Sequence, residues 1–328
     1  MDSPIRIGIV GYGNLGRGVE TALQHQPDMT LTGVYTRRDP TALQTGFATT
    51  PVHAMDRLEE HGDAIDVLIL CGGSREDLPR QGPELAAHFS TVDSFDTHQR
   101  IPEYFSAMDA PARQGGHTAL ISVGWDPGLF SLQRMLGEAL LPRGNTYTFW
   151  GKGLSQGHSD AVRRVPGVRA GVQYTLPSTE ALEQVRSGQR PALTPPEQHV
   201  RECYVVLEEG ADPAEVEQAI VTMPHYFADY STRVHFLSEE ELRRDHADMP
   251  HGGYVLRSGD TSADQRQMME FSLKLGSNPE FTASVLVACA RATHRLNRQG
   301  QHGAFTLFDV APGLLSPEAP EALRRRLL

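Results

Sequence analysis

Hydrophobic and polar positions in the first part of the chain follow two alternating periodicities. Short apolar runs with the length and composition of buried strands are Ile5–Val10, Leu31–Thr36, Ile65–Leu70, Ser90–Asp93 and Thr118–Val123. Between them apolar residues recur at helical spacing, as at Leu15, Val19 and Leu23. Strands that alternate with helices are typical of βαβ units around a parallel sheet. The pattern predicts an α/β fold with a Rossmann-type, doubly wound parallel sheet domain over residues 1–123.

The pattern changes beyond residue 123. Turns rich in Gly and Pro become dense, and strand-like runs appear at Cys203–Leu207 and Arg233–Leu237. Glu280–Leu296 has the apolar spacing of a long helix. These features predict a second, α+β domain over residues 124–299. Phe305–Val310 is predicted as a strand that returns to the first domain, so that residues 300–328 complete it.

Composition and charge narrow the range of partners. Lys and Arg number 30 against 41 Asp and Glu, and the formal net charge of -11 disfavours nucleic acid and anionic membranes. The apolar runs are far shorter than the ~20 residues that span a bilayer, and the first residues lack a signal-peptide pattern. Three widely spaced cysteines and fourteen scattered histidines match neither a disulfide framework nor a metal site. We expect a cytoplasmic protein without a metal that acts on a small molecule.

A glycine-rich segment follows the first predicted strand and opens the first predicted helix. It has the form G-x-G-x-x-G, and this strand-to-helix context is what the motif requires to indicate dinucleotide binding. Its first glycine permits a tight turn, the second a close approach of the pyrophosphate, and the third close packing. The helix N-terminus offers N–H groups and a partial positive charge to phosphates. The cofactor contacts predicted here are Gly11, Tyr12, Gly13, Asn14 and Leu15.

The end of the second predicted strand indicates which dinucleotide is bound. An acidic residue there accepts hydrogen bonds from the ribose 2′-OH of NAD, but this chain has Thr36, Arg37 and Arg38. Guanidinium groups bind a 2′-phosphate through charge-assisted hydrogen bonds, whereas a carboxylate repels it. The predicted cofactor is therefore NADP. The alternative is that both arginines belong to a solvated loop.

Three further strand ends are predicted to reach the cofactor, because ligands of doubly wound sheets lie outside the carboxyl ends of the strands. We expect Cys71 to be a small buried side chain and no nucleophile, since nothing near it in sequence lowers its pKa. Trp125 and Asp126 stand at the predicted domain junction, a common place for a ligand. The predicted contacts at these ends are Cys71, Gly72, Gly73, Ser74, Asp93, Ser94, Phe95, Val123, Gly124, Trp125, Asp126 and Pro127.

Other segments, rich in uncommon residues, are spread over nearly the whole chain. They are Phe149–Ala161, Gln173–Pro177, Met249–Gly253 and Asn278–Ser284. Together with the glycine-rich loop, these segments resemble the meso-diaminopimelate dehydrogenases. The resemblance implies a homodimer of lysine biosynthesis. It also implies reversible, NADP-dependent oxidative deamination of meso-2,6-diaminopimelate at its D-centre, which yields L-2-amino-6-oxopimelate and ammonia.

The resemblance also implies a set of substrate-binding residues, to which Trp125 is added for its position. The set is Asp96, Trp125, Asp126, Trp150, Gln156, Gly157, Thr175, Arg201, His251 and Asn278. Such a substrate carries an ammonium and a carboxylate at each end, so its site needs both signs of charge. Arg201 is suited to clamp a carboxylate, with Thr175 and His251 as further donors.

Asp96 and Asp126 are the candidate catalytic residues. Either carboxylate is suited to hold an ammonium group, or to accept a proton from the reacting amine before the hydride leaves. The sequence does not assign the base to one of them. Without the resemblance, Arg201 would be interpreted as the edge of a surface strand.

Two other functions stay open at this point. One is another two-domain Rossmann dehydrogenase, acting on a different amino acid, a semialdehyde or a sugar. The other is a non-catalytic sensor of NADP(H). A hydrolase built on the contiguous His158, Ser159 and Asp160 is disfavoured, because triad members come from separate parts of a fold.

Overall fold

The computed structural model describes residues 3–248 and 250–328, with the main chain alone at Gln156. The chain divides into two compact units, which are unit 1, Met1–Leu132 with Pro279–Leu328, and unit 2, Gln133–Asn278. The chain therefore enters unit 2 after the expected residue 123 and leaves it before the expected residue 299. The early return has a clear cause, since the long helix that begins at Asn278 packs in the core of unit 1.

Unit 1 is built on a seven-stranded sheet with the order β14-β6-β5-β4-β1-β2-β3. All neighbouring strands run parallel. The strands are β1 Ile5–Val10, β2 Met29–Thr36, β3 Val52–Ala54, β4 Val67–Leu70, β5 Thr91–Asp93, β6 Thr118–Leu120 and β14 Gly303–Phe305. The strand order reverses between β1 and β4, and this reversal opens a crevice at the carboxyl ends of the strands.

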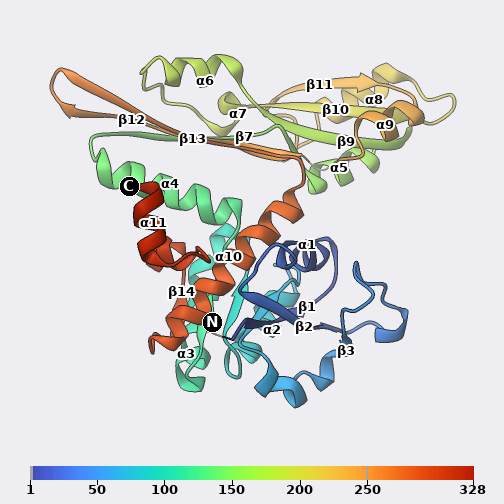
Figure 1. Ribbon diagram of the computed structural model, residues 1–328. Helices are drawn as coiled ribbons and strands as arrows, with labels where there is room; N and C mark the ends of the chain where they lie inside the picture. Colours follow the sequence, from blue (N-terminus) through green and yellow to red (C-terminus); the bar gives the residue numbers. More distant parts are fainter. Residues whose placement is uncertain (1–2, 249) are drawn as a thin grey trace. The chain divides into compact units, whose positions relative to one another are not determined.

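Helices cover both faces of this sheet (Figure 1). On one face Ile7 and Ile9 pack with α1 (Asn14–Leu23) and α10 (Asn278–Arg298). On the other face Leu68 and Leu70 pack with α2 (Asp77–Ala86) and α3 (Ile101–Gly115). Because successive strand residues point to opposite faces, burial on both sides requires the continuous apolar runs seen in the sequence. The predicted doubly wound α/β domain is confirmed.

The prediction of a strand over Phe305–Val310 is wrong beyond its first residue. β14 ends at Phe305, after pairing with β6, so the chain does return to the sheet of unit 1. Leu307–Asp309 instead forms a 3-10 turn. The Thr306 hydroxyl accepts the Phe308 N–H, and the Asp309 carboxylate accepts the Thr306 N–H. Side chains of Thr and Asp that bond the local backbone in this way favour a capped turn over a strand.

The rest of unit 1 is made of short elements. The 3-10 turns besides Leu307–Asp309 are Pro40–Ala42, Met55–Arg57, Glu59–Ala64, His98–Arg100 and Pro312–Leu314, and the last helix is α11, Pro320–Leu327. Arg291 of α10 ties this last part of the chain to the sheet. Its guanidinium binds the Asp28 carboxylate at 2.6 Å and the Leu315 carbonyl at 2.8 Å.

Unit 2 holds two sheets, of orders β11-β10-β9-β8 and β13-β12-β7. The strands are β7 Gly144–Trp150, β8 Gly153–Leu154, β9 Val168–Pro177, β10 His199–Leu207, β11 Ser231–Phe236, β12 His251–Ser262 and β13 Gln265–Leu275. The pairs are antiparallel except β10 with β11, which is parallel. The predicted mixed α+β domain is confirmed.

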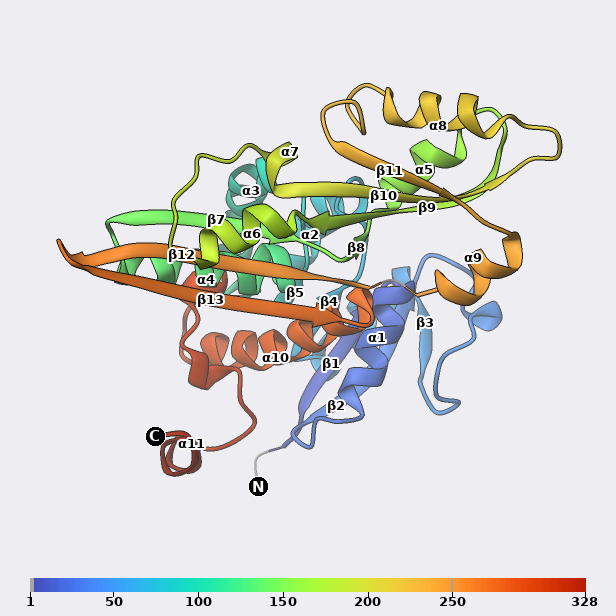
Figure 2. The same cartoon turned by 90° about the horizontal axis from the view of Figure 1, so that it is seen from above.

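The helices of unit 2 are short. They are α5 Gln156–Arg163, α6 Thr179–Arg186, α7 Pro195–Gln198, α8 Pro213–Val221 and α9 Glu239–Asp245, and α4 Phe130–Leu140 crosses from unit 1. Figure 2 shows α5 and α8 on the same side of β9 and β10. Val162 of α5 and Val216 of α8 pack there against Cys203 and Val205. Among the helices that the structure describes, none is both long enough and apolar enough for a membrane span.

Candidate active site

The glycine-rich loop between β1 and α1 has a geometry suited to a pyrophosphate. Gly11 has φ +87°, in the region that favours glycine, and a Cβ at Gly13 would meet no atom within 4 Å. A Cβ at Gly16 would overlap the carbonyl oxygen of Gly11, so the third glycine lets α1 approach the loop itself. Gly18, which the motif does not include, brings α1 against Ala283 of α10. The open space beside Gly13 faces the free N–H groups of the helix N-terminus.

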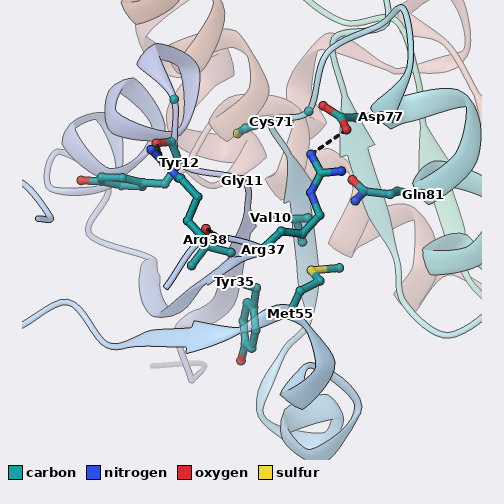
Figure 3. A pocket seen from close by; sticks show the side chains of 13 residues that line it. Val10, Gly11, Tyr12, Tyr35, Arg37, Arg38, Met55, Cys71, Asp77 and Gln81 are labelled. Carbon is teal, nitrogen blue, oxygen red and sulfur yellow. Dashed lines mark hydrogen bonds and ion pairs between the residues drawn. The ribbon is translucent and has the colours of Figure 1, made fainter. Parts of the chain in front are cut away.

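A cavity of about 290 Å³ opens at the carboxyl ends of β1, β2 and β4 (Figure 3). Its lining residues are Val10, Gly11, Tyr12, Gly13, Tyr35, Thr36, Arg37, Arg38, Met55, Cys71, Gly72, Asp77 and Gln81. Burial raises the pKa of the Cys71 thiol, which keeps this side chain a thiol. The cavity therefore combines the glycine-rich loop with the two arginines that follow β2.

Two guanidinium groups and one carboxylate set the charge of this cavity. Arg37 Nη2 lies 2.7 Å from Asp77 Oδ1, the contact drawn as a dashed line in Figure 3. Asp77 Oδ2 also accepts the Gly73 N–H at 3.1 Å, and this bond and the Arg37 contact hold the pKa of Asp77 low. Arg38 donates to the Tyr12 carbonyl. Since one of the two cations has no carboxylate partner among the described residues, the wall suits the 2′-phosphate of NADP, with Arg37 and Arg38 as the residues to hold it.

A buried glutamate holds one side of the cavity in place. Glu20, 1% exposed, accepts the Tyr12 hydroxyl through Oε2 and the Thr50 hydroxyl through Oε1. The Gly46 N–H lies 2.9 Å from the same Oε2. Through these bonds α1 fixes both Tyr12, whose carbonyl orients Arg38, and the segment between β2 and β3. No local pattern in the sequence signals this network, because its members are 8 to 34 residues apart.

A second buried carboxylate, Asp93, joins the segments that follow β5 and β6. Asp93 Oδ1 accepts the N–H of Phe95 at 2.9 Å and of Ser122 at 3.1 Å, and Oδ2 accepts the Tyr104 hydroxyl at 2.9 Å. Burial raises the pKa of Asp93 to about 6, against the lowering effect of these bonds. The side chain predicted as a cofactor contact is thus directed into the protein interior.

The same two segments carry the candidate catalytic acids. Asp96 lies one residue beyond Phe95, and its N–H donates to Ser74 Oγ at 3.1 Å, which joins it to the segment after β4. Trp125 and Asp126 follow Ser122. The Trp125 ring meets the Phe130 ring edge-on, with ring centroids 5.3 Å apart. Asp93 is therefore a shared anchor for the backbone on which both acids stand.

Unit 2 contains a buried guanidinium with only neutral neighbours. Arg201 of β10 stands opposite Thr175 of β9 and donates to its hydroxyl. It is 9% exposed, and burial lowers its pKa. In the described chain its Nε has no hydrogen-bond acceptor and no carboxylate forms an ion pair with it. A buried cation without a counter-charge is costly, so this guanidinium is prepared to receive an anionic group.

Trp150 and His199 form a fixed pair in the same unit. Their rings stack with centroids 5.3 Å apart, and the backbone N–H of Trp150 donates to His199 Nε2 at 2.9 Å. Burial lowers the pKa of His199 to about 4, so the ring is neutral. With Nε2 accepting, the proton stands on Nδ1, 3.1 Å from the Pro195 carbonyl. The indole of Trp150, 39% exposed, is thereby held at the end of β7.

The remaining predicted substrate residues are dispersed over several elements. His251 begins β12, with its ring beside Gly153, and Asn278 begins α10. A Cβ at Gly157, in the first turn of α5, would meet no atom within 4 Å. The side chain of Gln156 lies outside the described part of the chain. Among the described residues, no cluster of three or more His, Cys, Asp and Glu is arranged to hold a metal.

Comparison with known proteins identifies the family. Residues 124–277 match the family described as the diaminopimelic acid dehydrogenase C-terminal domain. The meso-diaminopimelate D-dehydrogenase of Ureibacillus thermosphaericus is 61% identical over 326 residues, which cover 99% of this chain and 100% of the relative. The chain belongs to the meso-diaminopimelate dehydrogenase family.

Two solved structures extend the comparison to ligands. The Corynebacterium glutamicum dehydrogenase in complex with DAP has 47% identity and a TM-score of 0.88, with full coverage of both chains. An engineered D-amino acid dehydrogenase bound to NADP⁺ has 46% identity and a TM-score of 0.82, and covers 99% of this chain and 100% of its own. The predicted family, fold class, NADP dependence and class of amino-acid dehydrogenase are confirmed.

In this member of the meso-diaminopimelate dehydrogenase family, only some of the predicted cofactor contacts line the same cavity. The glycine loop, the segment after β2 and the start of the segment after β4 share the cavity, whereas the predicted contacts after β5 and β6 lie outside its lining. Five lining residues were not predicted as cofactor contacts, namely Val10, Tyr35, Met55, Asp77 and Gln81. Asp77 did have a local sequence signal as a cavity residue. It starts α2 four residues after Gly73, and the next residue, Leu78, anchors that helix in the core.

Proposed function

We propose that the protein catalyses the reversible, NADP-dependent oxidative deamination of meso-2,6-diaminopimelate at its D-centre, with L-2-amino-6-oxopimelate and ammonia as products. The single observation that carries the proposal is the buried Arg201 guanidinium, which lacks a carboxylate partner among the described residues. Diaminopimelate offers the carboxylate that such a group requires. Family membership and the cavity for NADP support the same conclusion.

The proposed roles of the residues follow from their chemistry. Arg201, with Thr175 and His251, binds a substrate carboxylate through donated hydrogen bonds. Asp96 and Asp126 bind ammonium groups, and one of them accepts the proton that the reacting amine loses. NADP, when bound, supplies the hydride acceptor. Water then adds to the resulting imine and releases ammonia, so the site must admit one water after the hydride has left.

We propose further that unit 1 binds NADP, and that unit 2 contributes Arg201, Thr175 and His251 to substrate binding and forms a dimer. The remaining contacts are proposed as the sequence analysis assigned them, with Trp125, Trp150, Gln156, Gly157 and Asn278 around the substrate. A cytosolic homodimer follows from the family resemblance. Light scattering is expected to give twice the 36.1 kDa mass of the chain.

The first experiment follows NADPH absorbance with purified protein and meso-diaminopimelate, in parallel with the LL isomer, D-alanine and L-glutamate, each with NADP and with NAD. Reduction with the meso isomer and NADP alone supports the proposal. Reduction of NADP only with another of these substrates would show that the protein is a dehydrogenase of a different amino acid. Tight NADPH binding with no turnover of any substrate would favour a sensor.

Arg201→Met tests the carboxylate assignment. Losing charge-assisted hydrogen bonds of ~1.5–3 kcal/mol is expected to raise the Michaelis constant for diaminopimelate at least tenfold, with the constant for NADP unchanged. The matched control is Arg233→Met, since Arg233 lies on the neighbouring β11, is 64% exposed and pairs with Glu202. Equal constants for wild type and Arg201→Met would remove Arg201 from the site.

A further inference from the structure

The aromatic ring of Tyr230 covers the Arg201 guanidinium. The Arg201 Cζ atom lies 4.1 Å from the centroid of that ring. The strand register explains the contact, because Arg201 of β10 pairs with Thr232 of β11 and Tyr230 lies two residues before Thr232. Tyr230 lies in the turn directly before β11, which begins at Ser231, and from this turn its ring reaches the Arg201 guanidinium.

Local hydrogen bonds hold Tyr230 in this position. Its N–H donates to the Phe227 carbonyl at 2.9 Å. The Thr232 hydroxyl lies 3.3 Å from the carbonyl oxygens of both Phe227 and Tyr230. Phe227 is fully buried in the cluster beneath α5 and α8. The ring that meets Arg201 is thus anchored through its own backbone to the core of unit 2.

The other neighbours of Arg201 are neutral. Burial lowers the pKa of His158 to about 4, with Arg201 as a second cause, so this imidazole carries no charge. Thr175 contributes a hydroxyl. A guanidinium surrounded in this way keeps its full positive charge available to a ligand, and an aromatic face stabilises it without supplying a competing carboxylate.

A ring above a guanidinium acts differently from a hydrogen-bonding partner in one respect. It fixes the plane of the guanidinium but leaves its N–H groups, which lie in that plane, directed past the ring. Thr175 occupies Nη1, while Nε is buried without an acceptor in the described residues. Because a carboxylate binds a guanidinium in its plane, the orientation of that plane decides where the carboxylate lies.

We propose that Tyr230 is a positioning residue, which sets the plane of the Arg201 guanidinium and thereby the affinity of the enzyme for a substrate carboxylate. This inference rests on the proposed function, since it requires Arg201 to bind the substrate. The Tyr230 side chain also forms a hydrogen bond with Arg201, but the proposal assigns the positioning to the ring and not to the hydroxyl group. Tyr230→Phe therefore retains the function that Tyr230→Leu loses.

The test compares steady-state kinetics of the full-length Tyr230→Leu and Tyr230→Phe enzymes. For Tyr230→Leu we expect the Michaelis constant for meso-diaminopimelate to rise roughly 3- to 30-fold, the range that a desolvated cation–π contact supports. The turnover number and the constant for NADP should stay at their wild-type values. Tyr230→Phe should match wild type in all three. Tyr226→Leu is the matched control, because Tyr226 belongs to the same turn but its ring meets His158.

Three results would overturn the proposal. They are an unchanged constant for diaminopimelate in Tyr230→Leu, an equal defect in Tyr230→Phe, and a Tyr230→Leu enzyme that loses turnover or thermal stability in place of substrate affinity. Arg201→Met, measured in parallel, separates this inference from the proposed function. If Arg201→Met raises the Michaelis constant for diaminopimelate and Tyr230→Leu does not, only the role proposed for Tyr230 is refuted. If Arg201→Met has no effect, the carboxylate assignment itself fails.

Discussion

Asp93 offers a direct test of the reasoning about buried charge. Its carboxylate is fully buried and accepts three hydrogen bonds, yet burial still raises its pKa to about 6. Asp93→Asn removes the titrating group and preserves the geometry, because the amide oxygen can accept the N–H groups of Phe95 and Ser122. The amide nitrogen can donate to the Tyr104 oxygen, which changes from donor to acceptor.

The sign of the pH effect follows from proton linkage. An aspartate in the unfolded chain has a pKa of ~3.9, so the folded protein holds this proton more tightly. The resulting stabilisation is complete below about pH 3.9 and is lost as the pH rises through about 6. The difference between the two pKa values corresponds to a loss of about 3 kcal/mol, at about 1.4 kcal/mol for each pH unit between them. The side-chain amide of the Asp93→Asn variant does not titrate, so the variant has no such loss.

The assay is urea unfolding, followed by circular dichroism, of wild type and Asp93→Asn at several values between about pH 4.5 and pH 8, a range that spans the folded-state pKa of about 6. Carboxylates elsewhere in the chain contribute equally to the unfolding free energy of both proteins, so their contributions cancel when the two free energies are subtracted. The unfolding free energy of the variant should rise relative to wild type with increasing pH and level off above about pH 7. A difference that is constant with pH, or that changes in the opposite direction, would show that hydrogen bonds outweigh burial at Asp93.

Two further predictions concern other charged groups. Arg37→Ala should raise the Michaelis constant for NADP by roughly 10- to 100-fold, since it removes a charge-assisted contact and uncovers the Asp77 carboxylate. Adding Asp77→Asn to Arg37→Ala should restore part of the affinity for NADP. A further loss of that affinity would show that the uncovered Asp77 carboxylate does not repel the cofactor. Arg291→Met should lower the unfolding free energy by about 2–4 kcal/mol, less than for a fully buried pair because Asp28 is 30% exposed. Thermal unfolding tests this against Arg324→Met, an exposed pair on α11 expected to cost under ~1 kcal/mol.

The parts of the fold that the sequence predicted are those with strong local signals. β1, the glycine-rich loop and α1 are contiguous, and the chemistry of each follows from its neighbours in sequence. Strand ends in a doubly wound sheet converge by topology, so Arg37, Cys71 and Gly72 could be placed around one cavity without coordinates. Thr306 and Asp309 also carry a local signal for a capped turn, but the apolar residues between them fit a strand equally well.

The parts that the sequence did not predict depend on pairings between distant segments. Asp93 stands at a strand end, where a ligand contact is the reasonable expectation, and only the folded chain brings Tyr104 and Ser122 to its oxygens. In sequence, Arg201 has polar neighbours, as is typical of a surface strand. In the fold, α5 and α8 pack against β10, the strand that carries Arg201. Tyr230 has no signal, since its role depends on the register of β11 with β10.

Comparison among the buried arginines gives a physical criterion for a binding group. Arg291, 1% exposed, and Arg257, 6% exposed, use every guanidinium nitrogen in hydrogen bonds to protein acceptors. Arg201 is buried nearly as deeply, but it has a hydroxyl and an aromatic ring for neighbours and, within the described residues, an Nε without an acceptor. An unsatisfied charged group lowers stability by several kcal/mol at most sites, and a fold that satisfies the other two has the means to satisfy this one. The incomplete shell around Arg201 is therefore best explained by a ligand carboxylate that completes it.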